Sequence, residues 1–143
     1  MGCVIATLYA HHGYAVVLCD MNAGMLDSFT ERARPIAASF ASEPAAIDAM
    51  LARVRPEASL SQAVKNAFLV HEAVQEVLET KQALFAELDA LCPPEVVLAT
   101  NTSSLLLSDI GARVQQRERL LGLHYITPGH IIRSIEIISA DFT

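Results

Sequence analysis

The sequence predicts an α/β fold, in which a parallel sheet carries helices on both of its faces. Two observations support this prediction. Short apolar runs alternate with helical segments, which is the pattern of parallel strands joined by crossover helices. Apolar residues make up 52% of the 143 residues and charged residues only 18%, as expected for a sheet that is buried on both faces. A chain of this length has room for one domain with a single sizeable core.

The charge and the cysteines narrow the class of protein. The net charge is −6 and no basic patch stands out, so nucleic acid and anionic membranes are poor candidates for partners. No apolar run is long enough to span a bilayer, and the N-terminus lacks the charged start of a targeting peptide. Cys3, Cys19 and Cys92 have no metal-site spacing. We predict free thiols, no metal site, and a reducing compartment such as the cytoplasm.

In the N-terminal half, the patterns predict two strands and several helices. Residues 2–12 form a helix that Gly13 ends in the left-handed conformation. The apolar run 14–19 is a strand, and a helix follows from about residue 22 to 42 with a bend at Pro35. The weaker signals that follow are a helical segment at 45–51, a strand at 52–55 and a short helix at 61–64.

In the C-terminal half, the alternation of strands and helices is clearer. The strongest helix is 76–91, because Val77, Leu78, Leu84, Phe85, Leu88 and Leu91 share one side. The predicted strands are 68–70, 96–99, 120–124 and 134–138, with a short helix at 108–114.

Polar side chains follow the later strands at the points where the strands end. Asn101, Thr102 and Ser103 come after the strand 96–99, and His124 ends the strand 120–124. Ligands of open α/β sheets bind outside the carboxyl ends of the strands. Glu136 lies between isoleucines, where a buried carboxylate needs a partner. We therefore expect His124, Glu136 and Ser103 to meet at one sheet edge.

Five segments, in order over nearly all of the chain, resemble a known family. They are Met1-Gly2 before a helix, HHGYAVVLCDMN, HEAVQEVLETKQALFAELD, LATNTSSL and GLHYITP with IEII after it. Together they resemble the NAD-binding domain of the L-3-hydroxyacyl-CoA dehydrogenase family. The resemblance implies a Rossmann-type fold that would lack its first strand, because the family opens with a strand and the loop G-x-G-x-x-G, and this chain begins at the last glycine, Gly2. Residues 1–143 would then be a partial NAD-binding domain, truncated at both ends.

The resemblance implies a cofactor role for six residues. Asp20 would accept the ribose hydroxyls of NAD, and Gly2 would let the first helix approach the pyrophosphate. Glu76 and Lys81 match positions near the ribose and nicotinamide end of NAD, and Ser103 matches a serine near the nicotinamide. Thr127 stands where the family residue contacts substrate or nicotinamide. Simpler interpretations stay open for these residues. Asp20 would be a helix N-cap, Glu76 and Lys81 a solvated helix start, and Asn101 and Ser103 part of a polar turn.

The resemblance also implies the chemistry. His124 would act as the base that removes a hydroxyl proton, with Glu136 orienting the imidazole. Ser103, with Asn101, would bind the oxygen of the substrate. Thr127 departs from the family, which usually has asparagine there, so the resemblance leaves the choice of substrate open.

The implied function is NAD-dependent oxidation of a 3-hydroxyacyl-CoA, as in fatty-acid β-oxidation. The partner is a small-molecule substrate, and the full-length form, with a further helical domain, would be a homodimer. Two alternatives stay open. One is a dehydrogenase of a 3-hydroxy acid without CoA. The other is a non-catalytic relative that serves as a structural or interaction module. The remaining histidines, His11, His12, His71 and His130, are predicted to be surface or helix-end residues.

Overall fold

The computed structural model describes residues 1–132 and 134–143. The chain divides into two compact units. The first unit comprises residues 1–63 together with the segment that begins at Thr127. The second unit comprises Val64–Ile126 and Ser134–Thr143.

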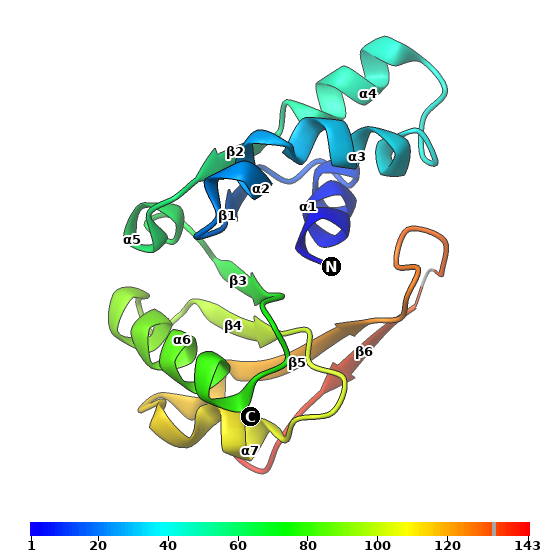
Figure 1. Cartoon of the computed structure of the whole chain (residues 1–143). Helices are drawn as coiled ribbons and strands as arrows, with labels where there is room; N and C mark the ends of the chain where they lie inside the picture. The colour runs from blue at the N-terminus through cyan, green and yellow to red at the C-terminus, as the bar shows by residue number, and fades with distance from the viewer. Residues whose placement is uncertain (133) are drawn as a thin grey trace. The chain divides into compact units, whose positions relative to one another are not determined.

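The described residues of the first unit form five helices and two strands, which are labelled in Figure 1. In chain order they are α1 (Gly2–His11), β1 (Val16–Cys19), α2 (Ala23–Asp27), α3 (Phe29–Ala37), α4 (Pro44–Leu51), β2 (Val54–Glu57) and α5 (Leu60–Ala63). β1 and β2 form a parallel two-stranded sheet, in a register that runs from the Val16–Val54 pair to the Cys19–Glu57 pair.

Alanine pairs bring the helices of the first unit close together. Ala6 and Ala10 are four residues apart on α1, and Ala33 and Ala37 are four residues apart on α3. Residues at this spacing share a helix face, and all four are at most 3% exposed. Larger side chains, among them Phe29, Ile47, Met50 and Leu51, complete the core.

The predicted stop at Gly13 is confirmed, because Gly13 has a φ of 91°. The prediction of one bent helix over residues 22–42 is wrong. The chain breaks at Ser28 into α2 and α3, and Pro35 lies inside α3. The Ser28 hydroxyl donates a hydrogen bond of 2.6 Å to the carbonyl of Gly24. A serine that bonds back to the preceding turn often bends a helix, and the break lies at this serine and not at the proline.

The second unit contains four strands beside two α-helices (Figure 1). Its elements are β3 (Leu69–Glu72), α6 (Leu78–Leu91), β4 (Val97–Thr100), α7 (Leu107–Ile110), the 3₁₀ turns η1 (Gly111–Arg113) and η2 (Arg117–Arg119), β5 (Leu120–Tyr125) and β6 (Ile135–Ile138). The sheet order is β3-β4-β5-β6.

The direction of the last strand differs from the prediction. β3, β4 and β5 are parallel, as expected, but β6 is antiparallel to β5. A parallel connection needs a crossover of a dozen or more residues, usually a helix. The segment between Tyr125 and Ile135 is too short for that, so the chain returns beside β5 in the opposite direction.

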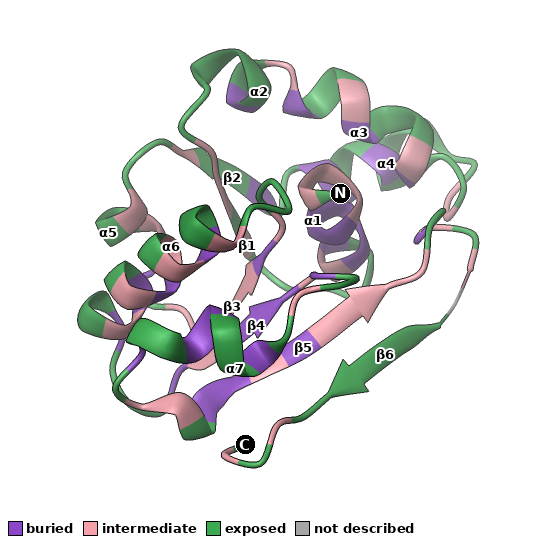
Figure 2. Cartoon of the chain, turned by 60° about the horizontal axis from the view of Figure 1, so that its bottom comes forward, coloured by how far each residue is buried: buried purple, intermediate pink, exposed green. Residues whose placement is uncertain are grey.

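The buried face of α6 agrees with its predicted pattern only in the middle. Phe85 and Leu88 are almost fully buried, whereas Val77 and Leu91 at the two ends are 44% and 39% exposed. Figure 2 shows the resulting contrast in the second unit between the buried strand β4 and the exposed strand β6.

The C-terminal end of α6 is held by one buried arginine. The guanidinium of Arg119 donates to the carbonyls of Asp89, Cys92 and Pro93 and to the Asp89 carboxylate at 2.7 Å. The last carbonyls of a helix have no partner within the helix, and a cation there also complements the helix dipole. Burial alone raises the pKa of Asp89, but the bonds from Arg119 and from the Gln115 amide outweigh it and lower the pKa. Arg119 therefore fixes α6 to the start of β5.

The described residues form two separate sheets. The helix α1 precedes both of them in the chain, β1 has β2 as its one neighbour, and β3 is an edge strand beside β4. The α/β class with parallel strands is confirmed. None of the helices in the described part of the chain is long and apolar enough to cross a membrane.

Candidate active site

Polar side chains gather at the carboxyl ends of the parallel strands in the second unit. Glu72 and Thr100 are the last residues of β3 and β4, and they are paired in the sheet register. His124 is the penultimate residue of β5. This is the edge at which α/β sheets bind ligands.

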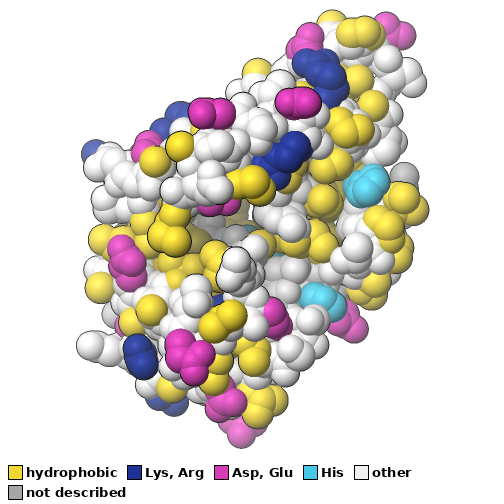
Figure 3. Space-filling view, viewed as in Figure 1, with side chains coloured by type: hydrophobic (Ala, Val, Ile, Leu, Met, Phe, Trp, Pro, Cys, Tyr) yellow, Lys and Arg dark blue, Asp and Glu magenta, His cyan; other side chains and the backbone are white. Residues whose placement is uncertain are grey.

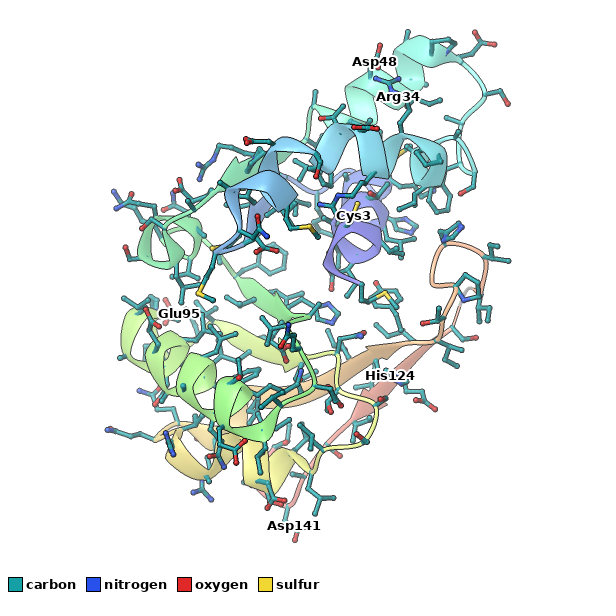
Figure 4. The ribbon with its side chains drawn as sticks, viewed as in Figure 1. Cys3, Arg34, Asp48, Glu95, His124 and Asp141 are labelled. Atoms are coloured by element: carbon teal, nitrogen blue, oxygen red, sulfur yellow. The ribbon has the colours of Figure 1, made fainter. Side chains whose placement is uncertain are left out.

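His124 and Glu136 are brought together by the antiparallel pair β5–β6. They stand directly opposite each other in the register, and His124 Nδ1 lies 2.8 Å from Glu136 Oε2. Figure 4 labels His124 on β5 beside β6. The predicted contact is therefore present. The expectation that Glu136 is buried is wrong, because its side chain is 57% exposed, and that of His124 is 23% exposed.

The contact with Glu136 determines which nitrogen of His124 can act as a base. A carboxylate only accepts hydrogen bonds, so Nδ1 is the nitrogen that donates its proton to Glu136. In the neutral imidazole, Nε2 then carries the lone pair. Nε2 makes no hydrogen bond to any of the described residues. This arrangement leaves an oriented imidazole with its basic nitrogen available.

Gly122 lets β6 come close enough for this contact. It is paired with Ile138, two residues from His124 and from Glu136 on each strand. A Cβ placed on Gly122 would lie 2.9 Å from the Cβ of Ile138. That atom is fixed to the backbone of β6, so the strand itself would have to move.

We expect Gly122→Ala to lower the free energy of unfolding by about 1–3 kcal/mol, as overpacking does, and to weaken the His124–Glu136 contact. Urea unfolding measures the first effect, and the NMR signals of the His124 ring measure the second. Gly122→Ala combined with Ile138→Gly removes the clash and should restore the contact. If Gly122→Ala leaves both readouts unchanged, β6 does not depend on this glycine.

Glu76 accepts several hydrogen bonds from the polar turn that follows β4. Its Oε1 accepts hydrogen bonds from the Thr102 hydroxyl, the Ser103 amide at 3.0 Å and the Ser104 hydroxyl at 3.3 Å. Burial, the largest single influence, raises the pKa of Glu76. The hydrogen bonds from Thr102 and Ser103 and the charge of Lys81 together outweigh it and lower the pKa to about 2. Since α6 begins at Leu78, Glu76 precedes the helix, and its predicted place within the helix is wrong.

Lys81 lies in the core beside the carboxylate of Glu72, which no motif in the sequence singles out. The side chains of Lys81 and Glu72 are each 1% exposed. Lys81 Nζ lies 2.7 and 2.8 Å from the two oxygens of Glu72 and 3.2 Å from Glu76 Oε2. Three acceptor oxygens match the three protons of the ammonium group. The Thr100 hydroxyl also donates to Glu72, at 2.6 Å.

Ser103 and Asn101, predicted to bind substrate, follow the end of β4. Ser103 is exposed, and it makes no hydrogen bond with His124 in the described part of the chain. The side-chain oxygen Oδ1 of Asn101 accepts a hydrogen bond of 2.9 Å from the backbone N–H of Tyr125. The backbone N–H of Asn101 donates to the backbone carbonyl of Glu72. Asn101 thus ties together the ends of β3, β4 and β5.

His71 was predicted to lie at the surface, and this prediction is wrong. It is partly buried on β3, with Nε2 2.8 Å from the carbonyl of Leu123, and its ring stacks on Tyr125. Burial lowers the pKa of His71 from 6.5 to about 4, against the smaller opposing effect of the Leu123 carbonyl. His71 is therefore neutral at pH 7.

The lowered pKa of His71 predicts a loss of stability in mild acid. Between pH 6.5 and about 4 the unfolded chain binds a proton at His71 that the folded chain does not. The free energy of unfolding should fall over this window by up to about 3 kcal/mol. Carboxylates with lowered pKa, such as Glu76, withdraw their stabilisation only below about 4.5. The urea midpoint between pH 6.5 and 4.5 therefore isolates His71, and His71→Phe should flatten this part of the curve. An equally steep slope in the variant would contradict the assignment.

Three further predicted residues belong to the first unit. Asp20 follows β1, and its Oδ1 accepts the Asn22 amide at 2.9 Å. Asn22, whose side chain accepts the Gly24 amide, is the N-cap of α2, so the interpretation of Asp20 as this cap is wrong. Asp20 Oδ2 has no hydrogen bond among the described residues. Gly2 opens α1, and Thr127 is exposed before a cis bond to Pro128.

Parallel strands joined by helices, with polar groups at their carboxyl ends, are the arrangement of Rossmann-type α/β domains. Comparison with known proteins gives the particular family. A sequence model of the 3-hydroxyacyl-CoA dehydrogenase NAD-binding domain matches residues 1–143, and the chain belongs to this family.

The relatives agree with this assignment. The chain is 36% identical to the 3-hydroxyadipyl-CoA dehydrogenase of Escherichia coli strain K12, over 97% of this chain and 30% of that protein. The crystal structure of 3-hydroxybutyryl-CoA dehydrogenase from Escherichia coli K12 is 34% identical, with a TM-score of 0.92, over 100% of this chain and 31% of that chain. A diketoreductase that acts on dicarbonyl compounds is also 34% identical, with a TM-score of 0.91, over 99% of this chain and 52% of that chain. The chain thus spans between about a third and a half of these proteins.

NAD is the cofactor of this family of domains, and residues of the first unit fit it. The second oxygen of the Asp20 carboxylate is available for a ribose hydroxyl. The first amides of α1, at Gly2 and Cys3, are donors that no residue within the helix can satisfy, and such amides bind phosphate.

Proposed function

We propose that this chain is the NAD-binding part of an oxidoreductase that converts the 3-hydroxyl of a 3-hydroxyacyl-CoA to the 3-keto form, as in fatty-acid β-oxidation. The observation that carries the proposal is the contact of 2.8 Å between His124 Nδ1 and Glu136 Oε2, with Nε2 available. Membership of the dehydrogenase family supports it.

The reaction removes a proton from the hydroxyl oxygen and a hydride from the carbon that bears it. Bound NAD⁺ supplies the hydride acceptor. His124 Nε2 takes the hydroxyl proton, and Glu136 stabilises the imidazolium that forms. In the reverse direction the same nitrogen returns the proton to the carbonyl oxygen.

The other residues bind and orient in this proposal. The exposed hydroxyl of Ser103 holds the 3-oxygen of the substrate, and Asn101 fixes the strand ends that carry Ser103 and His124. Asp20 accepts ribose hydroxyls and disfavours a 2′-phosphate by its negative charge. Gly2 and Thr127 contribute to the cofactor site, and Glu76 fixes the turn of Ser103.

The test is NADH consumption with acetoacetyl-CoA, by this chain and by a longer form that contains it. We expect turnover that Glu136→Gln lowers by at least about tenfold, because an amide does not stabilise the imidazolium as a carboxylate does. Glu95→Gln, on the loop before β4, is the matched control and should leave turnover unchanged. If no form that contains this sequence consumes NADH with any 3-keto compound, the chain is a structural or interaction module instead.

A second candidate is a 3-hydroxy acid or ketone without CoA. It is favoured by the similarity to the diketoreductase and by Thr127, at the position where the family usually carries asparagine. Comparing kcat/KM for acetoacetyl-CoA with that for free 3-keto acids and diketones separates the two candidates. A higher kcat/KM for the free compounds would show that the substrate is not a CoA ester.

We also propose that the full-length form is a homodimer, as the family resemblance implies, and that it works in a reducing compartment such as the cytoplasm. None of Cys3, Cys19 and Cys92 forms a disulfide within the described part of the chain, which supports the second statement. The Lys and Arg side chains do not gather into a patch on the face shown in Figure 3, in keeping with a small-molecule partner.

A further inference from the structure

We propose that Glu72, Lys81 and Thr100 form a positioning cluster that fixes Glu76 and, through it, the turn that carries Ser103. The consequence for turnover rests on the proposed function, but the placement of the turn does not. None of the three side chains has to touch substrate or cofactor for this role.

Burial makes the cluster a rigid anchor. Glu72 and Lys81 are in contact at 2.7 and 2.8 Å with side chains that are 1% exposed, and Thr100 is fully buried. A buried ion pair adds little net stability compared with apolar side chains of the same size. Where such pairs contribute, they specify one geometry, so the question is which geometry this pair specifies.

Two paths lead from the cluster to the turn. In the first, Lys81 on α6 contacts Glu76 Oε2 at 3.2 Å, and Glu76 Oε1 accepts the amide of Ser103. In the second, the Thr100 hydroxyl donates to Glu72 and accepts the amide of Thr102 at 3.3 Å. The Thr102 hydroxyl in turn donates to Glu76. The two paths meet at Glu76, so the turn is held from the helix and from the strand together.

This arrangement gives Lys81 a role in addition to the place near the ribose and nicotinamide end of NAD that the family resemblance implies. All three protons of its ammonium group have acceptors on Glu72 and Glu76. Lys81 therefore acts through Glu76, as a positioning residue.

The decisive variant replaces both charges together, as Glu72→Met with Lys81→Met, so that no unpaired charge is left in the core. We expect the full chain to stay folded while Ser103 is released. The amide proton of Ser103 should shift in the NMR spectrum and exchange with solvent about tenfold faster, which corresponds to the loss of one hydrogen bond to a charged group. The pKa of the Glu76 carboxyl should rise from about 2.

Asp89→Asn is the matched control, because it removes the charge of the other buried ion pair in this unit, Asp89 with Arg119. It should lower stability and leave the Ser103 amide unchanged. If the double variant does not fold, Thr100→Val provides the readout, since it removes one hydroxyl and should shift the amides of Thr102 and Ser103. An unchanged Ser103 amide in a folded double variant, or in Thr100→Val, overturns the proposal.

In a form that turns over, the double variant should lower kcat about tenfold with little change in KM, the signature of a misplaced reacting group. The NMR result needs neither cofactor nor turnover. A failure of the positioning proposal is therefore distinguishable from a failure of the proposed function.

Discussion

Replacing Lys81 alone by methionine is expected to destabilise the protein by about 3–5 kcal/mol, the usual cost of breaking a buried ion pair from one side. The variant keeps Glu72, whose side chain is 1% exposed, without the cation that contacts both of its oxygens. The Thr100 hydroxyl and the Val74 amide still donate to Glu72, but two neutral donors do not replace an ammonium group. The removed methylenes are few, so the loss comes from the charge.

Urea unfolding measures this loss, because the free energy of unfolding extrapolates linearly to zero denaturant. The control is Arg34→Met. Arg34 on α3 contacts Asp48 on α4 at the same distance of 2.7 Å, but the two side chains are 48% and 61% exposed (Figure 4). Exposed pairs contribute at most about 1 kcal/mol. Similar losses in the two variants would show that Glu72 and Lys81 are solvated and not part of the core.

His124→Ala is expected to lower kcat by about 10²- to 10⁴-fold in any form of the protein that consumes NADH, which is the usual contribution of a general acid or base. KM should change little, because the imidazole takes part in proton transfer and contributes little to the binding of the substrate. His12→Ala, at the exposed C-cap of α1, is the control and should be as active as the unmodified protein. A His124→Ala variant with unchanged kcat would assign the proton transfer to another group.

Much of the fold could be predicted because strands and helices differ in local pattern. The segments of α1, α6, β4 and β5 have the apolar spacing of their type, and the structure confirms them. The direction of β6 does not follow from its own pattern, since a strand has the same alternation whichever way it runs. The signal that fixes it is the short connection between Tyr125 and Ile135. The helix breaks at Ser28, whose hydroxyl bonds to the carbonyl of Gly24, and not at the more visible Pro35.

The site was also predicted only in part, because residue types and local patterns do not show contacts between distant segments. His124 and Glu136 were selected from residue types and a family resemblance, and the structure brings them into contact. Glu72 and Thr100 were missed because their roles depend on pairing across strands and on Lys81, nine residues beyond Glu72. His71 was misplaced because a single histidine gives no sign of burial in sequence. The roles of Glu72, Thr100 and His71 therefore became visible only from the contacts that the folded chain makes.

The most direct test of the account is the tautomer of His124, measured from the ¹⁵N chemical shifts of its ring at a pH where the imidazole is neutral. The contact with Glu136 predicts a proton on Nδ1 and a lone pair on Nε2, and Glu136→Leu should abolish this preference. A proton on Nε2 in the unmodified chain, or a tautomer that does not respond to Glu136→Leu, would contradict the role of His124 as an oriented base.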